Sequence, residues 1–387
     1  MESFDWQFNC LHKVAPMQCE HFGACGACVV YEDGYEAQLN AKKELNAQRF
    51  KYFYNGEISV FKSPDSHYRS RSEFKIWHDG DDLRYAMNNV DKKGVVFINE
   101  CPQVNAHISS LMPKLLKSVK ENNIGFKLFG ADFLSSSDGE IVVSLLYHKK
   151  LDEEWRSVAT SIAQELNIYI IGRSRKQKVV IGQDYVTEIL NIDNKKYKFN
   201  HIENSFTQPN PRVNERMISW GMSHFENVGG DLLELYCGAG NFTLPFASLF
   251  DKVLATEVSK SSINAAKENM VLNDISNIEF VRMSVEDFVG ALDGVREFRR
   301  MKEVDMGAYD IDSIFVDPPR SGMDEASCNF CARHKHVLYI SCNPETLVRD
   351  LEILTLTHDV VDMAMFDQFP YTRHVEMGVK LIQKGVI

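Results

Sequence analysis

Long apolar runs, prolines and an excess of positive charge are all scarce in this sequence of 387 residues. No apolar stretch approaches the roughly 20 residues that a membrane-spanning helix needs. With 11 prolines, 22 glycines and 44% hydrophobic residues, the composition is that of a globular protein and excludes collagen-like and disordered classes. Lysine and arginine total 43 against 54 aspartates and glutamates, a formal net charge of -11. That sum counts against a nucleic-acid partner unless the cations are clustered.

The start of the chain lacks a secretory pattern, because residues 1–5 (MESFD) are acidic and no basic and then apolar run follows. We therefore expect a cytoplasmic protein that needs no membrane, and nothing in the sequence indicates an obligate protein partner. In that compartment, the nine cysteines are expected to be reduced thiols, catalytic groups or metal ligands rather than disulfides.

Three stretches of the chain differ in pattern. Residues 1–55 hold four of the nine cysteines and then a run without glycine or proline, residues 36–54, which predicts a helix. Residues 56–200 mix both patterns and predict an α+β module. Within it we expect a hairpin over residues 74–87, strands over 140–147 and 167–172, and a helix over 151–166.

From residue 201 onward, seven short apolar runs alternate with helix-like segments. The runs are residues 232–236, 253–257, 278–282, 314–317, 337–341, 360–366 and 375–382. Continuous apolar runs are typical of buried parallel strands. We therefore predict an α/β catalytic domain over residues 201–387, built on a Rossmann-like sheet of seven strands.

The first of these runs ends in a glycine-rich turn. Gly238 and Gly240 allow the backbone to approach a ligand at a helix N-terminus. Glu257 closes the second run and is placed to bind ribose hydroxyls, although a solvated strand end would look the same. Asn241 and Phe242 stand where a dinucleotide motif continues toward a third glycine, which favours S-adenosylmethionine (SAM) over a dinucleotide.

Two further residues come at the ends of later runs. Asp317 precedes two prolines that make the backbone rigid, and the alternative is a simple turn with an Asx-type bond. Cys342 precedes a predicted helix, whose dipole is expected to lower the pKa of the thiol, and the alternative is a small buried hydrophobe. Because open α/β sheets bind ligands at the carboxyl ends of their strands, we favour functional roles for both.

Four motifs resemble those of the SAM-dependent RNA 5-methyluridine methyltransferases. They are residues 236–241 (YCGAGN), 317–322 (DPPRSG), 341–344 (SCNP) and 369–376 (FPYTRHVE). The resemblance runs from about residue 35 to the C-terminus. Amino-methyltransferases share the Pro-Pro motif, but they carry an aromatic residue where Arg320 stands and lack the cysteine.

This resemblance implies the site residues. Cys342 would be the nucleophile that adds to uracil C6, and Glu376 the base that removes the C5 proton. The alternative for Glu376 is an ion pair with Arg373 or Lys380. Arg320 could stabilise the enolate oxygen. The SAM-contacting positions implied by the resemblance are Gln208, Tyr236, Asn241, Glu257 and Asp317.

The N-terminal cysteines form a separate pattern. Cys19, Cys25 and Cys28 place three thiols within ten residues, a set that suits zinc or an iron–sulfur cluster. Cys101, followed by proline, is our candidate for the fourth ligand, with Cys10 as its rival. The ribosomal-RNA members of the resembled family carry a comparable triplet that holds a [4Fe-4S] cluster, so we favour that cluster over zinc and over no metal. A second pair, 328–331 (CNFC), falls on a predicted helix over residues 324–336, and we expect no metal there.

RNA recognition is expected in the middle module. Residues 66–78 interleave cations with flat rings, and residues 172–178 carry four cations and no acid, although either could be a solvated face. Residues 66–78, 143–155 and 204–210 are close to the tRNA enzymes that methylate uridine 54 of the T loop. We therefore predict a tRNA partner, with ribosomal RNA as the alternative substrate and a non-catalytic RNA-binding factor as the alternative of another class.

Overall fold

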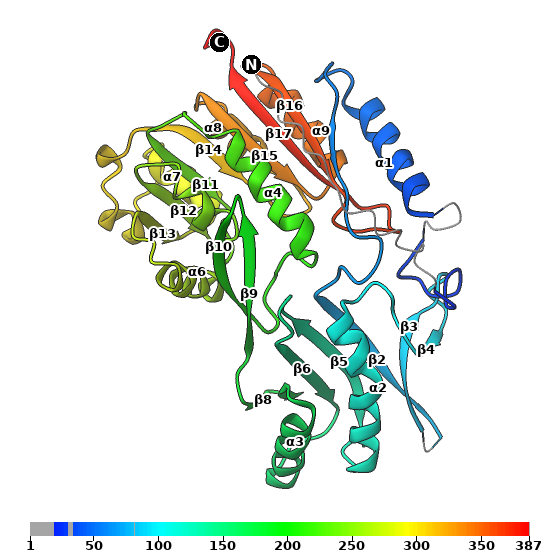
Figure 1. Ribbon diagram of the computed structural model, residues 1–387. Coiled ribbons are helices and arrows are strands. Elements are labelled where there is room, and N and C mark those ends of the chain that lie inside the picture. Colours follow the sequence, from blue (N-terminus) through cyan, green and yellow to red (C-terminus); the bar gives the residue numbers. More distant parts are fainter. Residues whose placement is uncertain (1–18, 30–33, 81, 387) are drawn as a thin grey trace.

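The computed structural model describes residues 19–29, 34–80 and 82–386. Its strands form two large sheets, one of eight strands and one of seven, with a separate two-stranded hairpin (Figure 1). No helix in the described part of the chain is both long enough and apolar enough to cross a membrane.

The eight-stranded sheet has the order β1-β16-β17-β15-β14-β11-β12-β13. Its strands are β1 (Ser59–Phe61), β11 (Asp231–Leu235), β12 (Val253–Glu257), β13 (Ile278–Arg282), β14 (Ile311–Val316), β15 (His336–Ser341), β16 (His358–Phe366) and β17 (Glu376–Gln383). The seven runs predicted from residue 201 onward are β11 to β17, so that prediction is confirmed. Their continuous apolar character follows from burial on both faces, as in β11, where all five residues are buried.

The eighth strand corrects the predicted count of seven. β1 comes from far earlier in the chain and pairs in parallel with β16, with Ser59 opposite Ala364. Three residues are too few to show a strand pattern in a sequence, which is why β1 was not expected. The helix α1 (Gly34–Phe50), which stops short of the predicted end at residue 54, lies on the same sheet and shares a core with Ile58.

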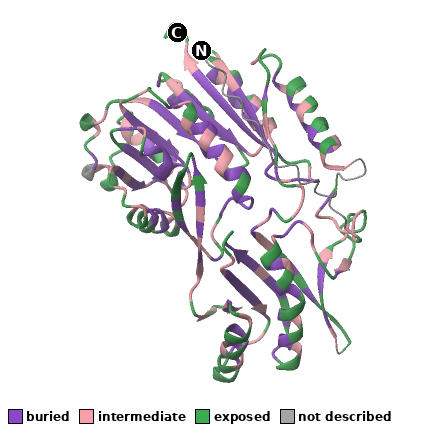
Figure 2. Ribbon diagram, viewed as in Figure 1, coloured by how far each residue is buried: buried purple, intermediate pink, exposed green. Residues whose placement is uncertain are grey.

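Helices cover both faces of this sheet (Figure 1). One face packs against α1, α7 (Val285–Leu292), α8 (Glu325–Cys331) and α9 (Pro344–Leu354). The other packs against α4 (Pro211–Ser223), α5 (Thr243–Phe246), α6 (Lys260–Leu272) and the hairpin of β9 (Tyr185–Ile192) and β10 (Lys195–Ile202). Two short 3-10 turns, η1 (Arg299–Glu303) and η2 (Met306–Ala308), precede β14. Figure 2 shows the resulting layers, with buried residues on the strands and exposed ones on the outer helix faces.

The seven-stranded sheet has the order β4-β3-β2-β5-β6-β7-β8. Its strands are β2 (Arg71–Asp79), β3 (Asp82–Asn88), β4 (Val95–Ile98), β5 (Leu128–Ser135), β6 (Ile141–Tyr147), β7 (Tyr169–Ser174) and β8 (Gln177–Ile181). The predicted hairpin is β2–β3, with Ile76 opposite Tyr85. The helices α2 (Ala106–Glu121) and α3 (Glu153–Leu166) share one core on the same face of the sheet.

Candidate active site at the carboxyl edge of the eight-stranded sheet

Three of the predicted cofactor residues lie at one register position, where parallel strands end. β11 pairs with β12 on one side and with β14 on the other, so Tyr236, Glu257 and Asp317 come at matching places. Strands are about 4.8 Å apart, which places Glu257 and Asp317 roughly 10 Å from each other across Tyr236. The strand order reverses between β11 and β14, the point where open α/β sheets bind ligands.

The glycine-rich turn after β11 is held by the carboxylate of Glu257. Its Oε2 accepts from the backbone N–H of Gly238 at 3.2 Å, and its Oε1 accepts from that of Ser259 at 2.6 Å. Gly238 and Gly240 have φ of 55° and 86°, a region that favours glycine. Glu257 is therefore a structural part of the turn.

The other two predicted cofactor residues have side-chain partners. Asn241 and Asn214 of α4 exchange two amide hydrogen bonds, of 2.7 and 2.9 Å. Gln208, in the loop before α4, accepts from the Nε2 of Gln368 at 2.8 Å. Both amides are thus fixed in orientation before any ligand binds.

The predicted nucleophile and base come together through an antiparallel register. β15 and β17 pair with Ser341 opposite Met377. One residue farther along, Cys342 and Glu376 come opposite each other, a relation that places Cβ atoms about 4.5–5.5 Å apart. Glu376 is buried, with 3% of its surface exposed, while Cys342 is partly open. The structure does not show the alternative, an ion pair of Glu376: Arg373 is exposed, and the Lys380 ammonium lies 4.8 Å from the Phe225 ring centre.

The electrostatics of this site correct one expectation. Burial, then the carboxyl groups of Glu376 and Asp317, raise the pKa of the Cys342 thiol to about 12, against a smaller lowering by Arg320. The prediction of a thiol with a lowered pKa is therefore wrong for the protein without substrate, because burial and two acids outweigh the dipole of α9. Burial also raises the pKa of Asp317 to about 7, and burial together with Asp317 holds that of Glu376 well above its ordinary range.

Arg320 lies at the exposed rim of the site. Its Nη2 is 3.1 Å from the Nδ1 of His374, two residues before the proposed base. The side chain of Asn343, which follows Cys342, donates to the carbonyl oxygen of Arg320 at 3.0 Å. The cation is thus held beside the pair of Cys342 and Glu376.

One acidic residue beneath the site was missed. Glu234 of β11 is 1% exposed, and its Oε2 has no hydrogen-bond partner. Burial, in the first place, raises its pKa well above the ordinary value. The signal was available, because an acid interrupts the apolar run 232–236.

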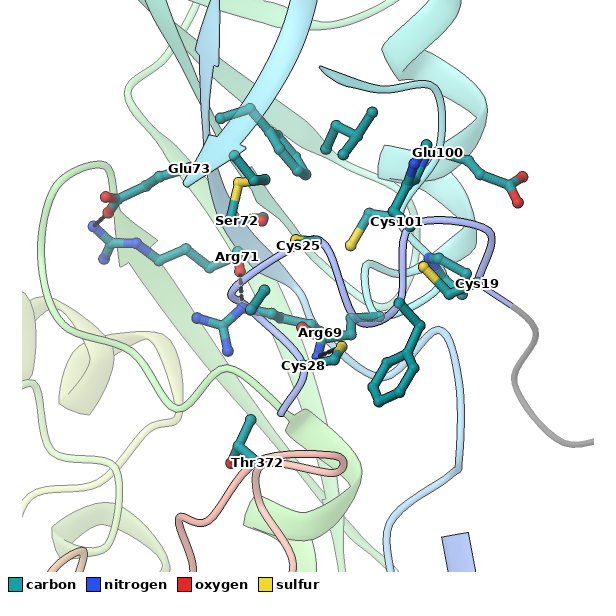
Figure 3. Close-up of a pocket in the computed structure, with 18 residues that line it drawn as sticks. Cys19, Cys25, Cys28, Arg69, Arg71, Ser72, Glu73, Glu100, Cys101 and Thr372 are labelled. Carbon is teal, nitrogen blue, oxygen red and sulfur yellow. Dashed lines mark hydrogen bonds and ion pairs between the residues drawn. The ribbon is translucent and has the colours of Figure 1, made fainter. Parts of the chain in front are cut away.

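The four N-terminal ligand candidates line one cavity of about 360 Å³, which Figure 3 shows with Cys19, Cys25, Cys28 and Cys101 around it. Gln103 donates to the sulfur of Cys28 at 2.8 Å. Within the described ranges, no group of three or more His, Cys, Asp or Glu side chains is arranged to hold a metal ion. The rival ligand Cys10 lies outside the described residues.

The second cysteine pair is part of the core. Cys328 and Cys331 are both fully buried on α8, which ends at Cys331 rather than at the predicted residue 336. The thiol of Cys331 contacts the sulfur of Met323 at 3.8 Å.

The predicted RNA segments are only partly available to a ligand. In residues 66–78, the rings of Tyr68 and Phe74 are buried, whereas Trp77 is 46% exposed. In residues 172–178, Arg173 is paired with Glu203 at 2.5 Å, an acid that the local sequence does not show. Three groups at the far end of the same sheet were missed. They are Phe126, Phe129 and His148. Phe126 is 65% exposed, and the rings of Phe129 and His148 stack with their centres 4.0 Å apart.

The fold is that of a SAM-dependent methyltransferase. The family model described as tRNA (Uracil-5-)-methyltransferase matches residues 34–384. The chain is 66% identical over 369 residues to a Sulfurimonas denitrificans protein named tRNA/tmRNA (uracil-C(5))-methyltransferase, covering 95% of this chain and 100% of that protein. A protein of the same name from a Sulfurovum species is 49% identical, again over 95% and 100%.

A solved structure supports the fold. It is that of Pyrococcus abyssi tRNA (uracil-54, C5)-methyltransferase in complex with S-adenosyl-L-homocysteine, with a TM-score of 0.68 and 21% identity over 90% of this chain and 83% of that one. This chain belongs to the tRNA (uracil-5-)-methyltransferase family. The family and the α/β fold predicted from the sequence are confirmed.

Proposed function

We propose that this protein transfers the methyl group of SAM to C5 of a uridine in tRNA, uridine 54 of the T loop, in the cytoplasm. The observation that carries the proposal is the antiparallel register that sets Cys342 opposite Glu376, beside the row of Tyr236, Glu257 and Asp317. From Glu257 to Glu376 the row crosses four strand spacings, roughly 19 Å. That length accommodates a nucleoside with a sulfur-linked chain and a uracil at its reactive end.

The chemistry assigns one role to each residue of the pair. The Cys342 thiolate adds to uracil C6, so electrons of the C5–C6 double bond move onto O4 as an enolate. SAM would supply an electrophilic methyl carbon on a positively charged sulfur; as C5 bonds to that carbon, the carbon–sulfur bond breaks and S-adenosylhomocysteine leaves as a neutral thioether. The Glu376 carboxylate then removes the proton left on C5, and the bond from C6 to sulfur breaks. Uracil regains its double bond, and Cys342 leaves as a thiolate.

The raised pKa values suit this sequence of steps. A carboxylate with a raised pKa is a stronger base, which favours removal of the C5 proton by Glu376. Both groups must be deprotonated before they act, Cys342 as a thiolate and Glu376 as a carboxylate. The positive sulfur of SAM is the charge that would lower the pKa values of Cys342, Glu376 and Asp317 together, so we expect the thiol to become reactive when SAM is bound.

Residues of the family's binding positions hold SAM in this proposal. Glu257 would accept from the ribose hydroxyls, while Tyr236, Asn241 and Gln208 line the turn and the loop beside it. Asp317 stands between the cofactor row and Cys342. Arg320 would stabilise the enolate oxygen, for which its exposed guanidinium beside the pair is suited.

The names of the curated relatives support tRNA as the substrate. Exposed rings and cations at the far end of the seven-stranded sheet add a physical reason. Phe129 stacks on His148, and the Lys149 ammonium lies 5.8 Å from the centre of the exposed Phe126 ring. Flat rings beside cations are what unpaired bases and phosphates need. The net charge of -11 therefore matters less than this local grouping.

A methyl-transfer assay with tritiated SAM tests the substrate. A T-arm hairpin should accept label, and the same hairpin with cytidine in place of uridine 54 should not. Labelling of ribosomal RNA fragments in preference to the hairpin would favour the alternative substrate. Binding of both RNAs without any labelling would favour a non-catalytic RNA-binding factor.

We also propose that Cys19, Cys25, Cys28 and Cys101 hold a [4Fe-4S] cluster. The donor set supports it, since four thiols face one cavity of about 360 Å³. Iron and sulfide contents after anaerobic purification, with the visible absorbance, test this proposal. Stoichiometric zinc without iron would contradict it.

A further inference from the structure

The connection between β16 and β17 frames the proposed base. Phe366 pairs with Glu376 across these two antiparallel strands, so the 367–375 loop starts and ends beside Glu376. Within this loop, Gln368 donates to Gln208, and His374 contacts Arg320. The 367–375 loop therefore meets the site at Gln208, at Arg320 and at Glu376 itself. Its conformation decides where the Glu376 carboxylate lies relative to Cys342.

Two side chains of α1 hold this loop from behind. The Lys42 ammonium donates to the Oδ1 of Asp367 at 2.6 Å and to the carbonyl oxygen of Phe369 at 3.1 Å. The Gln38 Nε2 donates to the Oδ2 of Asp367 at 3.0 Å, and its Oε1 accepts from the backbone N–H of Tyr371 at 3.2 Å. All three polar side chains are buried, with Gln38 3%, Lys42 7% and Asp367 0% exposed.

Because this network is buried, a contribution to the stability of the fold does not by itself explain why these polar residues are there. Taking an ammonium and a carboxylate out of water costs about as much as their attraction returns, and apolar residues of the same size often stabilise a fold as well. What such a network does supply is one defined arrangement. Tyr371 needs it, because it is fully buried in the left-handed region with φ of 60°, which is costly for a residue with a side chain.

Other contacts complete the attachment of the loop. The Tyr68 hydroxyl donates to the carbonyl oxygen of Pro370 at 3.1 Å. The backbone N–H of Val29 donates to the carbonyl oxygen of Tyr371 at 2.9 Å. The network from α1 differs from these two contacts because it alone brings a buried charge pair to the first residue of the loop. Asp367 directly follows Phe366, the strand partner of Glu376.

We propose that Lys42 and Gln38, acting through Asp367, are positioning residues for Glu376. They keep the 367–375 loop in the one conformation that places the carboxylate opposite Cys342. The inference rests on the proposed function, in which Glu376 removes the C5 proton. Neither α1 residue touches the reacting atoms, so their loss should slow proton removal rather than attack by Cys342 or methyl transfer.

The test is Lys42→Met, with Lys43→Met as its matched control. Lys43 is the next residue on α1, but its side chain is 42% exposed and pairs with Glu57 at 3.1 Å. Lys42→Met should lower kcat by about tenfold or more, because small misplacements of a reacting group are costly. It should also raise the fraction of RNA bound covalently to the protein on a denaturing gel. The KM for SAM should change less than kcat, since Asn241 and Glu257 are held by other elements and only Gln208 is tied to the 367–375 loop. Lys43→Met should match the unchanged protein in kcat, in the fraction of covalently bound RNA and in the KM for SAM.

Two more variants keep the test decisive. Lys42→Arg retains the charge and should recover part of the turnover. Gln38→Leu leaves the ion pair intact and should show the same adduct at a lower level, which decides the case if Lys42→Met does not fold. Normal turnover without adduct in folded Lys42→Met or Gln38→Leu would overturn the inference, and so would a loss proportional to the unfolded fraction. If Glu376→Gln itself forms no adduct, the proposed function fails instead.

Discussion

The carboxyl edge of the eight-stranded sheet and the cysteine cavity are built in opposite ways. At the edge, strand register brings Tyr236, Glu257 and Asp317 to matching places and sets Cys342 opposite Glu376. The cavity takes its thiols from a loop and from a turn before α2, and they form no set arranged around one ion in the described chain. Sites on strands are preorganised, whereas sites on loops need the ligand to complete them.

The largest loss of methyl transfer should come from removing the proposed nucleophile at the carboxyl edge. Cys342→Ala should lower methyl transfer by about a thousandfold or more, because the covalent route is lost. Binding of T-arm RNA, measured by filter retention, should change little. Cys328→Ala, which removes a thiol from the core of α8, serves as the control and should retain turnover per folded molecule. Normal turnover of Cys342→Ala would rule out the covalent mechanism.

Breaking the cavity should have a different outcome. Cys28→Ser should remove the iron and the visible absorbance, because one of four ligands is lost. Methyl transfer should fall far less than in Cys342→Ala, since strand register still holds the edge. Iron analysis and the tritium assay on one preparation measure both. Loss of all turnover with the edge residues intact would mean that the two regions act as a single unit.

The pH dependence of Cys342 alkylation tests the electrostatics of the carboxyl edge. Thiolate is the reactive form, and a pKa of about 12 keeps the thiol protonated in the absence of SAM. The rate with iodoacetamide, followed by peptide mass spectrometry, should rise about tenfold per pH unit from pH 7 to 10 without reaching a plateau. Glutathione is the control and should level off near its ordinary pKa. A plateau for Cys342 below pH 9 would contradict the raised pKa.

The smallest effect should come from the partner of one cofactor residue. Asn214→Ala removes the two hydrogen bonds that orient the Asn241 amide. A net hydrogen bond is worth about 0.5–1.5 kcal/mol, so the KM for SAM should rise by up to about tenfold with kcat nearly unchanged. A drop in kcat alone would show that Asn241 acts on the chemistry rather than on binding.

The sequence predicted the elements of the catalytic sheet better than the links between them. Apolar runs gave all seven strands from β11 to β17, because burial on both faces leaves a clear local pattern. β1 was not predicted, since three residues have no pattern and their pairing with β16 is a long-range contact. Glu257, Asp317 and Cys342 were proposed because each follows or closes an apolar run, whereas Gln208, Tyr236, Asn241 and Glu376 came from the resemblance of the motifs to those of the family.

The contacts that were missed all join distant segments. Asp367 meets Lys42 across 325 positions, and Gln208 meets Gln368 across 160. The pKa of Cys342 was expected to fall because the helix after it was visible in the sequence, while its burial and the acids beside it were not. The same reason explains why Tyr68 and Phe74 were taken as RNA-facing rings although both lie in the core.

The most direct test of the central claim uses Glu376→Gln with SAM and T-arm RNA. If Glu376 removes the C5 proton after Cys342 has attacked, this variant should stop with the RNA still attached through sulfur. A band of protein and RNA that survives denaturation should carry the tritiated methyl group, and digestion should locate the attachment at Cys342. Free methylated RNA released at the normal rate, with no such band, would contradict the account.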